Sequence, residues 1–377
     1  GEMNKTAPCS LIEHFGDLED PRRYNRRHLL LDIVVIAICA SVCGADDWNG
    51  VASFGQAKYK WLSSFLALPH GIPSDDTFRR VFARLDARQF QERFITWVRD
   101  VFELTKGQVI PLDGKTLRRS HDRGIGKEAI HMVSAWATEN HLVLGQVKVD
   151  DRSNEIPAVQ ELLALLDISG CIVTADALHC QKKTAWQIIE QGADYVLRVK
   201  DNQSNLAQTL EELFEYAAET KFKDCDHHRT VDKGHGRIEI RECWTTSDGD
   251  YLRYVPNRDQ WSALQTLVMV KTERRLDGVV EKETKYYISS LPSNAEQILS
   301  AARGHWGIEN QLHWVLDIAF REDECRLRKG QGAENFALLR HIALTLLKQE
   351  QTLQVGIKNK RLRAGWDPEY LYKVLTG

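Results

Sequence analysis

The sequence predicts an α/β fold: a mixed sheet with flanking helices, preceded by a helical domain and interrupted by a β-rich insertion. Three observations support this class. Residues 10–105 show helical periodicity, residues 108–204 alternate short apolar strands with helices, and residues 205–290 consist largely of alternating strand patterns. Strands that alternate with helices are typical of a sheet with parallel strands joined by crossover helices.

The order of these patterns indicates five segments. We expect a helical N-terminal domain at 1–105, the first part of the sheet domain at 106–204, the β-rich insertion at 205–290, the closing helices of the sheet domain at 291–350, and a C-terminal surface tail that ends in a short helix at 351–377.

The N-terminal segment contains the most apolar run of the chain, from Leu29 to Cys43. This run is about 15 residues long, which is short of the ~20 needed to span a bilayer, and Asp32 interrupts it. It therefore predicts a buried helix and no membrane partner. A second helix is expected after Ser74 or Asp75, either of which can cap its N-terminus.

The sheet domain begins at Gln108 with a short strand and continues with two longer strands that form a hairpin around Glu139 and Asn140. A helix at 156–167, a strand at 171–176, a helix at 181–191 and a strand at 193–200 follow. Asp113 and Asp176 each end an apolar strand. Ligands collect at the carboxyl ends of such strands, so these carboxylates are candidate ligands.

The insertion is expected to hold a helix near 206–220 and four strands, with turns at 234–236 and 276–278. A helix from Ala295 to Ala319 follows, with a capping box from Ser293 to Glu296. His305, Glu309 and His313 share one face of that helix, since they are four residues apart. A last helix at 333–349 is apolar enough to pack in the core.

Composition excludes several classes of protein. The net charge is −3, so any nucleic-acid contact must use local patches. The eight cysteines include no C-x-x-C pair, which disfavours zinc and redox sites, and no secretory leader is apparent, so we expect a reducing cytoplasm. The segment Gly124–Lys127 is too short for a nucleotide loop, and nothing indicates a nucleotide ligand.

Asp113, Asp176 and Glu309 are the candidate catalytic and metal-binding residues. They come from unlike elements, two from strand ends and one from a helix, so they can converge on one point. Carboxylate oxygens suit Mg²⁺ or Mn²⁺, whose remaining positions are filled by water and phosphate oxygens. This donor set is typical of proteins that cut or join phosphodiesters.

Five sequence blocks carry a resemblance to a known family: VIPLDGKTLRRS, RSNEIPA, ADALHCQ, GADYVLRVKDNQ and RGHWGIENQLHWVLD. Together they resemble the H-repeat-associated (ISAs-type) transposases of bacterial insertion sequences, a branch of the DDE transposases with an RNase H-like catalytic core. The resemblance covers nearly the whole chain. It implies metal-dependent cleavage and strand transfer of insertion-sequence DNA ends.

The resemblance implies that Asp113, Asp176 and Glu309 form the metal-binding triad for two Mg²⁺ or Mn²⁺ ions. Asp113 would bridge both ions, and each of the other two would hold one. The wider group often places Tyr, Arg and Lys around the third carboxylate, where this chain has Ala302, His305 and Leu316. Arg303 and His305 are candidate replacements in DNA binding, and Asp317 and Glu322 are alternative third carboxylates.

The expected partners are double-stranded DNA at transposon ends, target DNA, and a second copy of the chain as a homodimer on DNA. When bound to DNA, the protein would be associated with the nucleoid. Basic residues near the proposed site and in the N-terminal domain are candidates for phosphate contacts, with salt-dependent binding: Arg22, Arg23, Arg26, Arg27, Arg79, Arg80, Lys115, Arg118, Arg119, Lys182, Lys183, Arg303 and His305. Lys358, Lys360 and Arg361 form a further basic cluster.

Each candidate also has a plainer interpretation. Asp113 can be a turn residue, Asp176 a helix cap and Glu309 a solvated helix residue. Each basic cluster can be a solvated face, and His305, Glu309 and His313 can be read as a zinc site, although the spacing lacks the HExxH form. A DNA-binding descendant without catalysis and a simple metal-dependent nuclease are the alternative functions.

Overall fold

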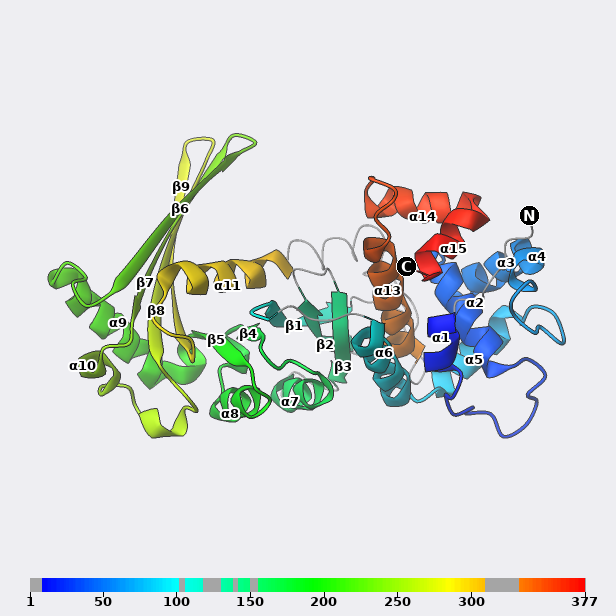
Figure 1. Ribbon diagram of the computed structural model, residues 1–377, viewed down its shortest axis with the longest axis horizontal. Helices are drawn as coiled ribbons and strands as arrows, with labels where there is room; N and C mark the ends of the chain where they lie inside the picture. Colours follow the sequence, from blue (N-terminus) through cyan, green and yellow to red (C-terminus); the bar gives the residue numbers. More distant parts are fainter. Residues whose placement is uncertain are drawn as a thin grey trace, which may run out of the picture. The chain divides into compact units, whose positions relative to one another are not determined.

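The structure is a computed structural model that describes residues 9–101, 106–117, 130–137, 142–149, 155–308 and 332–376. These residues form two compact units. The first contains the N-terminal helices, a β-hairpin and the C-terminal helices, and the second contains the remaining strands and the helices packed on them (Figure 1).

The first unit begins with the helical segment that the sequence predicts. Its helices are α1 (Cys9–Phe15), α2 (Leu30–Val42), α3 (Trp48–Ala57), α4 (Tyr59–Leu62), α5 (Asp75–Arg84) and α6 (Ala87–Val101). The apolar run forms α2, and nearly all of its residues are buried. The buried Asp32 carboxylate accepts a hydrogen bond from the Leu68 backbone N–H at 2.9 Å, which explains one acidic residue in an apolar helix.

Helix α5 begins where its capping signal predicts. The Ser74 hydroxyl accepts a hydrogen bond from the Thr77 backbone N–H at 3.2 Å. Phe78, Val81 and Phe82 are buried on one face, as their spacing predicts. The opposite face of α5 therefore remains available for its charged residues.

The C-terminal part of the first unit consists of α13 (Gly332–Gln349), α14 (Ile357–Trp366) and α15 (Pro368–Thr376). The prediction of a surface tail is wrong, because α14 and α15 contribute buried residues. Lys360 is 7% exposed and donates to the Leu347 carbonyl at 3.1 Å and to the Glu350 carbonyl. Lys360 and Arg361 are thus packed against neighbouring helices instead of forming an exposed basic cluster.

The predicted hairpin is confirmed. Strands β2 (Ile130–Ala137) and β3 (Leu142–Val149) pair antiparallel, with a register shift between Ala135 and Trp136. Strand β3 packs against α6 and α13 of the same unit. The expected turn at Glu139 and Asn140 lies outside the described residues.

The second unit is built on a mixed sheet with the strand order β1-β4-β5-β9-β8-β7-β6. The first half of β1 (Val109–Leu117), β4 (Ile172–Ala175) and β5 (Asp194–Val199) run parallel. Strands β9 (Val279–Ser289), β8 (Thr266–Leu276), β7 (Arg237–Thr246) and β6 (Asp226–Gly234) continue the sheet with antiparallel pairing. The predicted combination of parallel and antiparallel strands is therefore confirmed.

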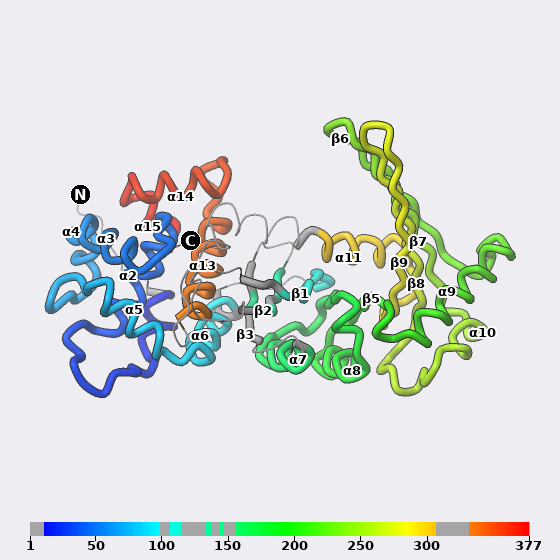
Figure 2. Tube along the Cα trace, turned by 180° about the vertical axis from the view of Figure 1, so that it is seen from behind, coloured from blue at the N-terminus to red at the C-terminus, as the bar shows by residue number. Residues whose placement is uncertain are grey.

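Helices cover both faces of this sheet. Helix α11 (Ala295–Ile308) contacts β4, β5, β6 and β7, and α8 (Lys182–Glu190) packs against β5 from the other side (Figures 1 and 2). Helix α9 (Ser204–Glu219) contacts β9, α7 (Glu155–Leu165) precedes β4, and the short α10 (Gly249–Leu252), which the sequence did not predict, follows β7. Buried residues of α11 and the strands, among them Leu299, Val268 and Tyr287, form one apolar cluster.

The predicted insertion has the expected helix and four strands. Both hairpin turns contain consecutive residues with positive φ: His235 and Gly236 at 51° and 75°, and Asp277 and Gly278 at 50° and 77°. These values suit tight hairpin turns whose twist matches that of the strands. Because β9 pairs with β5, the four strands extend the central sheet. The segment boundaries predicted from the sequence remain a proposal.

Helix α11 is capped differently from the prediction. The side chain of Asn294, and not that of Ser293, accepts a hydrogen bond from the first turn, from the Gln297 backbone N–H at 3.1 Å. The Ser293 hydroxyl instead bonds to the Thr245 hydroxyl on β7 at 2.9 Å. The described part of α11 ends at Ile308, and the rest of the helix predicted to Ala319 lies outside the described residues.

The structure also bears on the cysteine and membrane predictions. Four of the six cysteines whose side chains the structure describes are buried, and none of these six forms a disulfide. Burial raises the pKa of Cys180 and of Cys243 to about 12, so these thiols behave as small apolar groups. Within the ranges that the structure describes, no helix is long and apolar enough to cross a membrane.

Candidate metal and DNA site

The second unit brings Asp113 and Asp176 next to each other. Strands β1 and β4 run parallel, and their last paired residues are Leu112 and Ala175. Asp113 and Asp176 are the next residues on the two chains, so both carboxylates stand where this pairing ends. The prediction that Asp113 ends its strand is wrong, since β1 continues to Leu117, whereas Asp176 directly follows β4.

The alternation of side chains places both carboxylates on the α11 face of the sheet. A Cβ added to Gly304 would lie 3.1 Å from Val109 Cγ1, so Val109 faces α11, and Asp113, four residues later in the same strand, shares its face. Thr174 on β4 also faces α11, and Asp176 follows it by two residues in an extended backbone conformation. The two carboxylates therefore lie on one face of neighbouring strands.

His305 joins α11 to β4 beside this pair. Its Nδ1 lies 3.0 Å from the Thr174 hydroxyl. Burial, assisted by the positive charge of Lys285 and by His179, lowers the pKa of His305 to about 4. The ring is therefore neutral near pH 7, and it positions the last described turn of α11 against the sheet.

The sequence analysis missed His179. This residue is fully buried, and its Nε2 lies 3.9 Å from Asp176 Oδ1. The signal was present, since a histidine in an apolar context follows Asp176 by three residues. Its position beneath Asp176 depends on the short 3₁₀ turn from Ala177 to His179, which the sequence did not predict.

The third predicted carboxylate, Glu309, lies outside the described residues, as do His313, Asp317 and Glu322. The described part of α11 ends at Ile308, the residue before Glu309. In the described ranges, no group of three or more His, Cys, Asp or Glu side chains could hold a metal ion. The two adjacent carboxylates nevertheless fit Mg²⁺ or Mn²⁺, which need few protein oxygens.

A group of cations lies on the strands beside the end of α11. Trp306 is flanked by two of them, with Arg241 Cζ 5.1 Å and Lys285 Nζ 4.9 Å from its ring centroid. Arg303, which the sequence singled out, pairs with Asp232 on β6 at 2.7 Å. The sequence analysis did not select Arg241 or Lys285, because only the strand order places them near α11.

Other predicted DNA contacts are distributed more widely. Lys182 donates to the Gln260 side chain at 2.7 Å, and Lys183 is exposed beside it at the start of α8. Lys115 lies in β1, but its side chain is outside the described residues, as are Arg118 and Arg119 altogether. The DNA-binding roles of these residues stay predictions.

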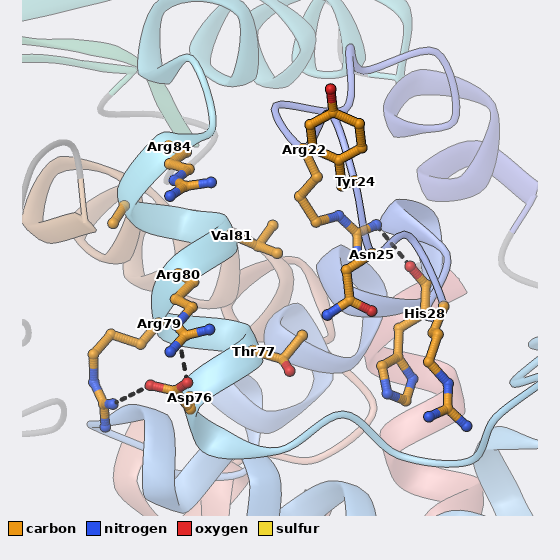
Figure 3. Close-up of a pocket in the computed structure, with 12 residues that line it drawn as sticks. Arg22, Tyr24, Asn25, His28, Asp76, Thr77, Arg79, Arg80, Val81 and Arg84 are labelled. Carbon is orange, nitrogen blue, oxygen red and sulfur yellow. Dashed lines mark hydrogen bonds and ion pairs between the residues drawn. The ribbon is translucent and has the colours of Figure 1, made fainter.

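In the first unit, four of the predicted arginines line one pocket of about 820 Å³ (Figure 3). Arg22 and Arg27 come from the segment before α2, and Arg79 and Arg80 come from α5. Arg84, which the sequence analysis did not select, lines the same pocket. Arg23 and Arg26 are exposed in the same segment but do not line the pocket.

Two known protein families match this chain. Residues 104–346 match the family described as the transposase DDE domain, and residues 12–98 match the family described as DDE_Tnp_1-associated. The chain therefore belongs to the DDE transposase family. The predicted mixed sheet with flanking helices, the helical N-terminal domain and the β-rich insertion are confirmed.

Two relatives that match nearly the whole chain come from Escherichia coli. The H repeat-associated putative transposase YhhI of strain K12 is 38% identical over 372 residues, which are 97% of this chain and 98% of that protein. The putative transposase YncI of O157:H7 is 38% identical over 382 residues, 97% and 94% of the two chains. A solved piggyBac transposase synaptic complex with hairpin DNA matches with a TM-score of 0.46 at 12% identity, over 97% of this chain and 76% of that one.

Proposed function

We propose that this member of the transposase family cleaves insertion-sequence DNA ends and transfers them to target DNA at the site formed by Asp113 and Asp176. The adjacency of the two carboxylates at the end of the β1–β4 pairing is the observation that carries the proposal. Residues 63 positions apart in sequence meet there because a parallel strand pair has a fixed register.

The proposed cofactor is a pair of Mg²⁺ or Mn²⁺ ions. When bound, such ions activate the attacking oxygen, water first and a DNA 3′-hydroxyl later, and stabilise the leaving oxygen. Asp113 would hold both ions, while Asp176 and Glu309 would each hold one. His305, whose lowered pKa keeps its ring neutral near pH 7, and the buried His179 position the elements around Asp176.

The proposed DNA path follows the cations near α11. Arg303 and Lys285, with the predicted contact at Lys115, would hold the phosphates of double-stranded DNA, while Trp306 packs between Lys285 and the buried Arg241. We further propose that the protein acts as a homodimer on paired DNA ends, in the bacterial cytoplasm and at the nucleoid. A dimer would hold two ends close enough for strand transfer.

The test is cleavage of DNA that carries the native genomic flanks of the gene, in Mg²⁺ or Mn²⁺ and in EDTA. Metal-dependent cuts at defined ends should appear with the wild type and disappear with Asp113→Asn and Asp176→Asn, which preserve side-chain volume. Asp167→Asn, at an exposed aspartate after α7, is the matched control and should cut normally.

The products decide between the proposed function and its alternatives. Joined products establish a transposase, whereas cuts without joining establish a nuclease. DNA binding without any metal-dependent cut would contradict the proposal and favour a catalytically silent DNA-binding descendant. Light scattering of the complex with end DNA tests the dimer, and a monomer on each DNA end would contradict that part.

A further inference from the structure

The pocket in the first unit is an open groove between α5 and the segment that precedes α2 (Figure 3). Five arginines line it, against one aspartate, Asp76. Three carboxylates, those of Asp20, Asp75 and Asp76, pair with arginines of the groove. The guanidinium groups outnumber these carboxylates by two, so the groove carries a net positive charge in a chain whose net charge is −3.

The arginines divide into structural and available groups. Arg22 is 8% exposed, pairs with Asp20 at 2.8 Å and donates to the His28 carbonyl at 2.6 Å, so it holds the segment in place. Arg79 bonds to both Asp75 and Asp76. Arg80 has a side chain that is 72% exposed, although it pairs with Asp76, and Arg84 is exposed.

Arg80 and Arg84 are one helical turn apart and therefore lie on the same side of α5, about 6 Å apart along its axis. Arg27 stands across the groove from them, within 3.5 Å of the His70 ring. Exposed guanidinium groups on both sides of an open groove suit a chain of phosphates better than a single small anion.

An aromatic ring completes the groove. Tyr24 lines it and is 87% exposed. Asn25, the next residue, has a φ of 59°, a left-handed conformation that asparagine tolerates well and that turns the chain sharply at the rim. A tyrosine ring left in solvent beside arginines is an available platform for stacking a base.

We propose that this groove binds an unpaired DNA strand, with phosphates on Arg27, Arg80 and Arg84 and a base stacked on Tyr24. A base can stack on a side chain only where it has no complementary partner, as at a frayed or single-stranded end. The proposal rests on the proposed function in taking DNA as the partner. The groove lies in the first unit and the carboxylates Asp113 and Asp176 lie in the second, so the groove proposal and the proposed catalytic function can fail separately.

The experiment measures binding by fluorescence anisotropy in EDTA, where no cleavage occurs. The probes are a blunt 20-base-pair duplex, the same duplex with a three-nucleotide overhang, and a single strand. We expect the wild type to bind the overhang about tenfold more tightly than the blunt end. Tyr24→Ala should remove that preference and Tyr24→Phe should keep it, because stacking needs the ring and not the hydroxyl.

The double variant Arg80→Gln and Arg84→Gln should weaken binding to the overhang about tenfold and reduce the salt dependence by about 1.4 in log–log slope, as expected for two lost phosphate contacts on a single strand. The matched controls change exposed residues of the same unit outside the groove: Arg88→Gln with Arg363→Gln, and Tyr59→Ala. These controls should bind all three probes like the wild type.

Three results would overturn the proposal. Equal affinity of the wild type for blunt and overhanging ends removes the unpaired strand as the ligand. An unchanged affinity in the double arginine variant excludes the groove. The third result is displacement of the single strand by polyglutamate at an equal concentration of charge, together with polyglutamate binding that Tyr24→Ala weakens as much as it weakens DNA binding. That result would assign the groove to an acidic protein. Loss of cleavage in Asp176→Asn with unaltered groove binding would leave the inference intact.

Discussion

Replacing His305 with glutamine should remove a pH dependence from the stability of the second unit. His305 lies between α11 and β4, with its Nδ1 3.0 Å from the Thr174 hydroxyl. Burial, with Lys285 and His179, lowers its pKa from 6.5 to about 4. Glutamine can keep a hydrogen bond to Thr174 but cannot take up a proton in this range.

The sign follows from the direction of the pKa shift. Between pH 6.5 and about 4 the unfolded chain binds a proton at His305 that the folded chain does not. The free energy of unfolding is therefore highest above pH 6.5 and falls as the pH decreases to about 4. A shift of this size corresponds to a ceiling of about 3 kcal/mol. Because His305 is half-buried and not fully buried, solvent screening reduces this ceiling, and we expect about 2 kcal/mol.

The assay is urea unfolding at pH 7.5 and pH 4.5, monitored by hydrogen exchange of peptides from β4 and α11. The local free energy of opening should fall by about 2 kcal/mol more in the wild type than in His305→Gln. His228→Gln, on β6 of the same unit, is the control and should behave like the wild type. An equal fall in the wild type and in His305→Gln would refute the reasoning.

Two further predictions concern the core of the first unit. Gly55→Ala should lower the free energy of unfolding by about 1–3 kcal/mol, since the added Cβ would lie 2.6 Å from Ile72 Cγ2, and thermal unfolding measures this. Asp32→Ala should cost about 2 kcal/mol in urea unfolding, because the buried Leu68 N–H loses its acceptor; a cost below about 0.5 kcal/mol would contradict that role.

Local sequence signals predicted most of the elements. The capping serine and the spacing of apolar residues located α5, and the turn residues located both hairpins of the four-stranded region. These signals work because each depends on backbone geometry within a few residues. The prediction failed before α11, where the sequence analysis chose Ser293 as the cap and the structure has Asn294 in that role. The choice between them follows from Thr245, a distant residue that binds the Ser293 hydroxyl.

The errors at the C-terminus have a related cause. A run of lysines and arginines is normally solvated, so Lys360 and Arg361 were interpreted as surface residues. In the structure, Lys360 donates to carbonyls at the end of α13, and Arg361 donates to the Ser41 carbonyl of α2 at 3.1 Å. Acceptors supplied by packed helix ends make such burial favourable, and their proximity is invisible in the sequence.

The sequence analysis selected Asp113 and Asp176 because ligands collect at the carboxyl ends of strands. Both residues do lie side by side, although β1 continues past Asp113 to Leu117. Strand β4 has only four residues and stops at Ala175, so the parallel pairing with β1 stops at Leu112. Asp113 is thus the first residue of β1 without a β4 partner in register, and Asp176 is its counterpart. The shorter strand therefore determines where the two candidate ligands meet on this parallel pair. The apolar run before Asp113, from Val109 to Leu112, is the part of β1 that pairs with β4. The sequence therefore shows where this pairing ends and not where the strand ends.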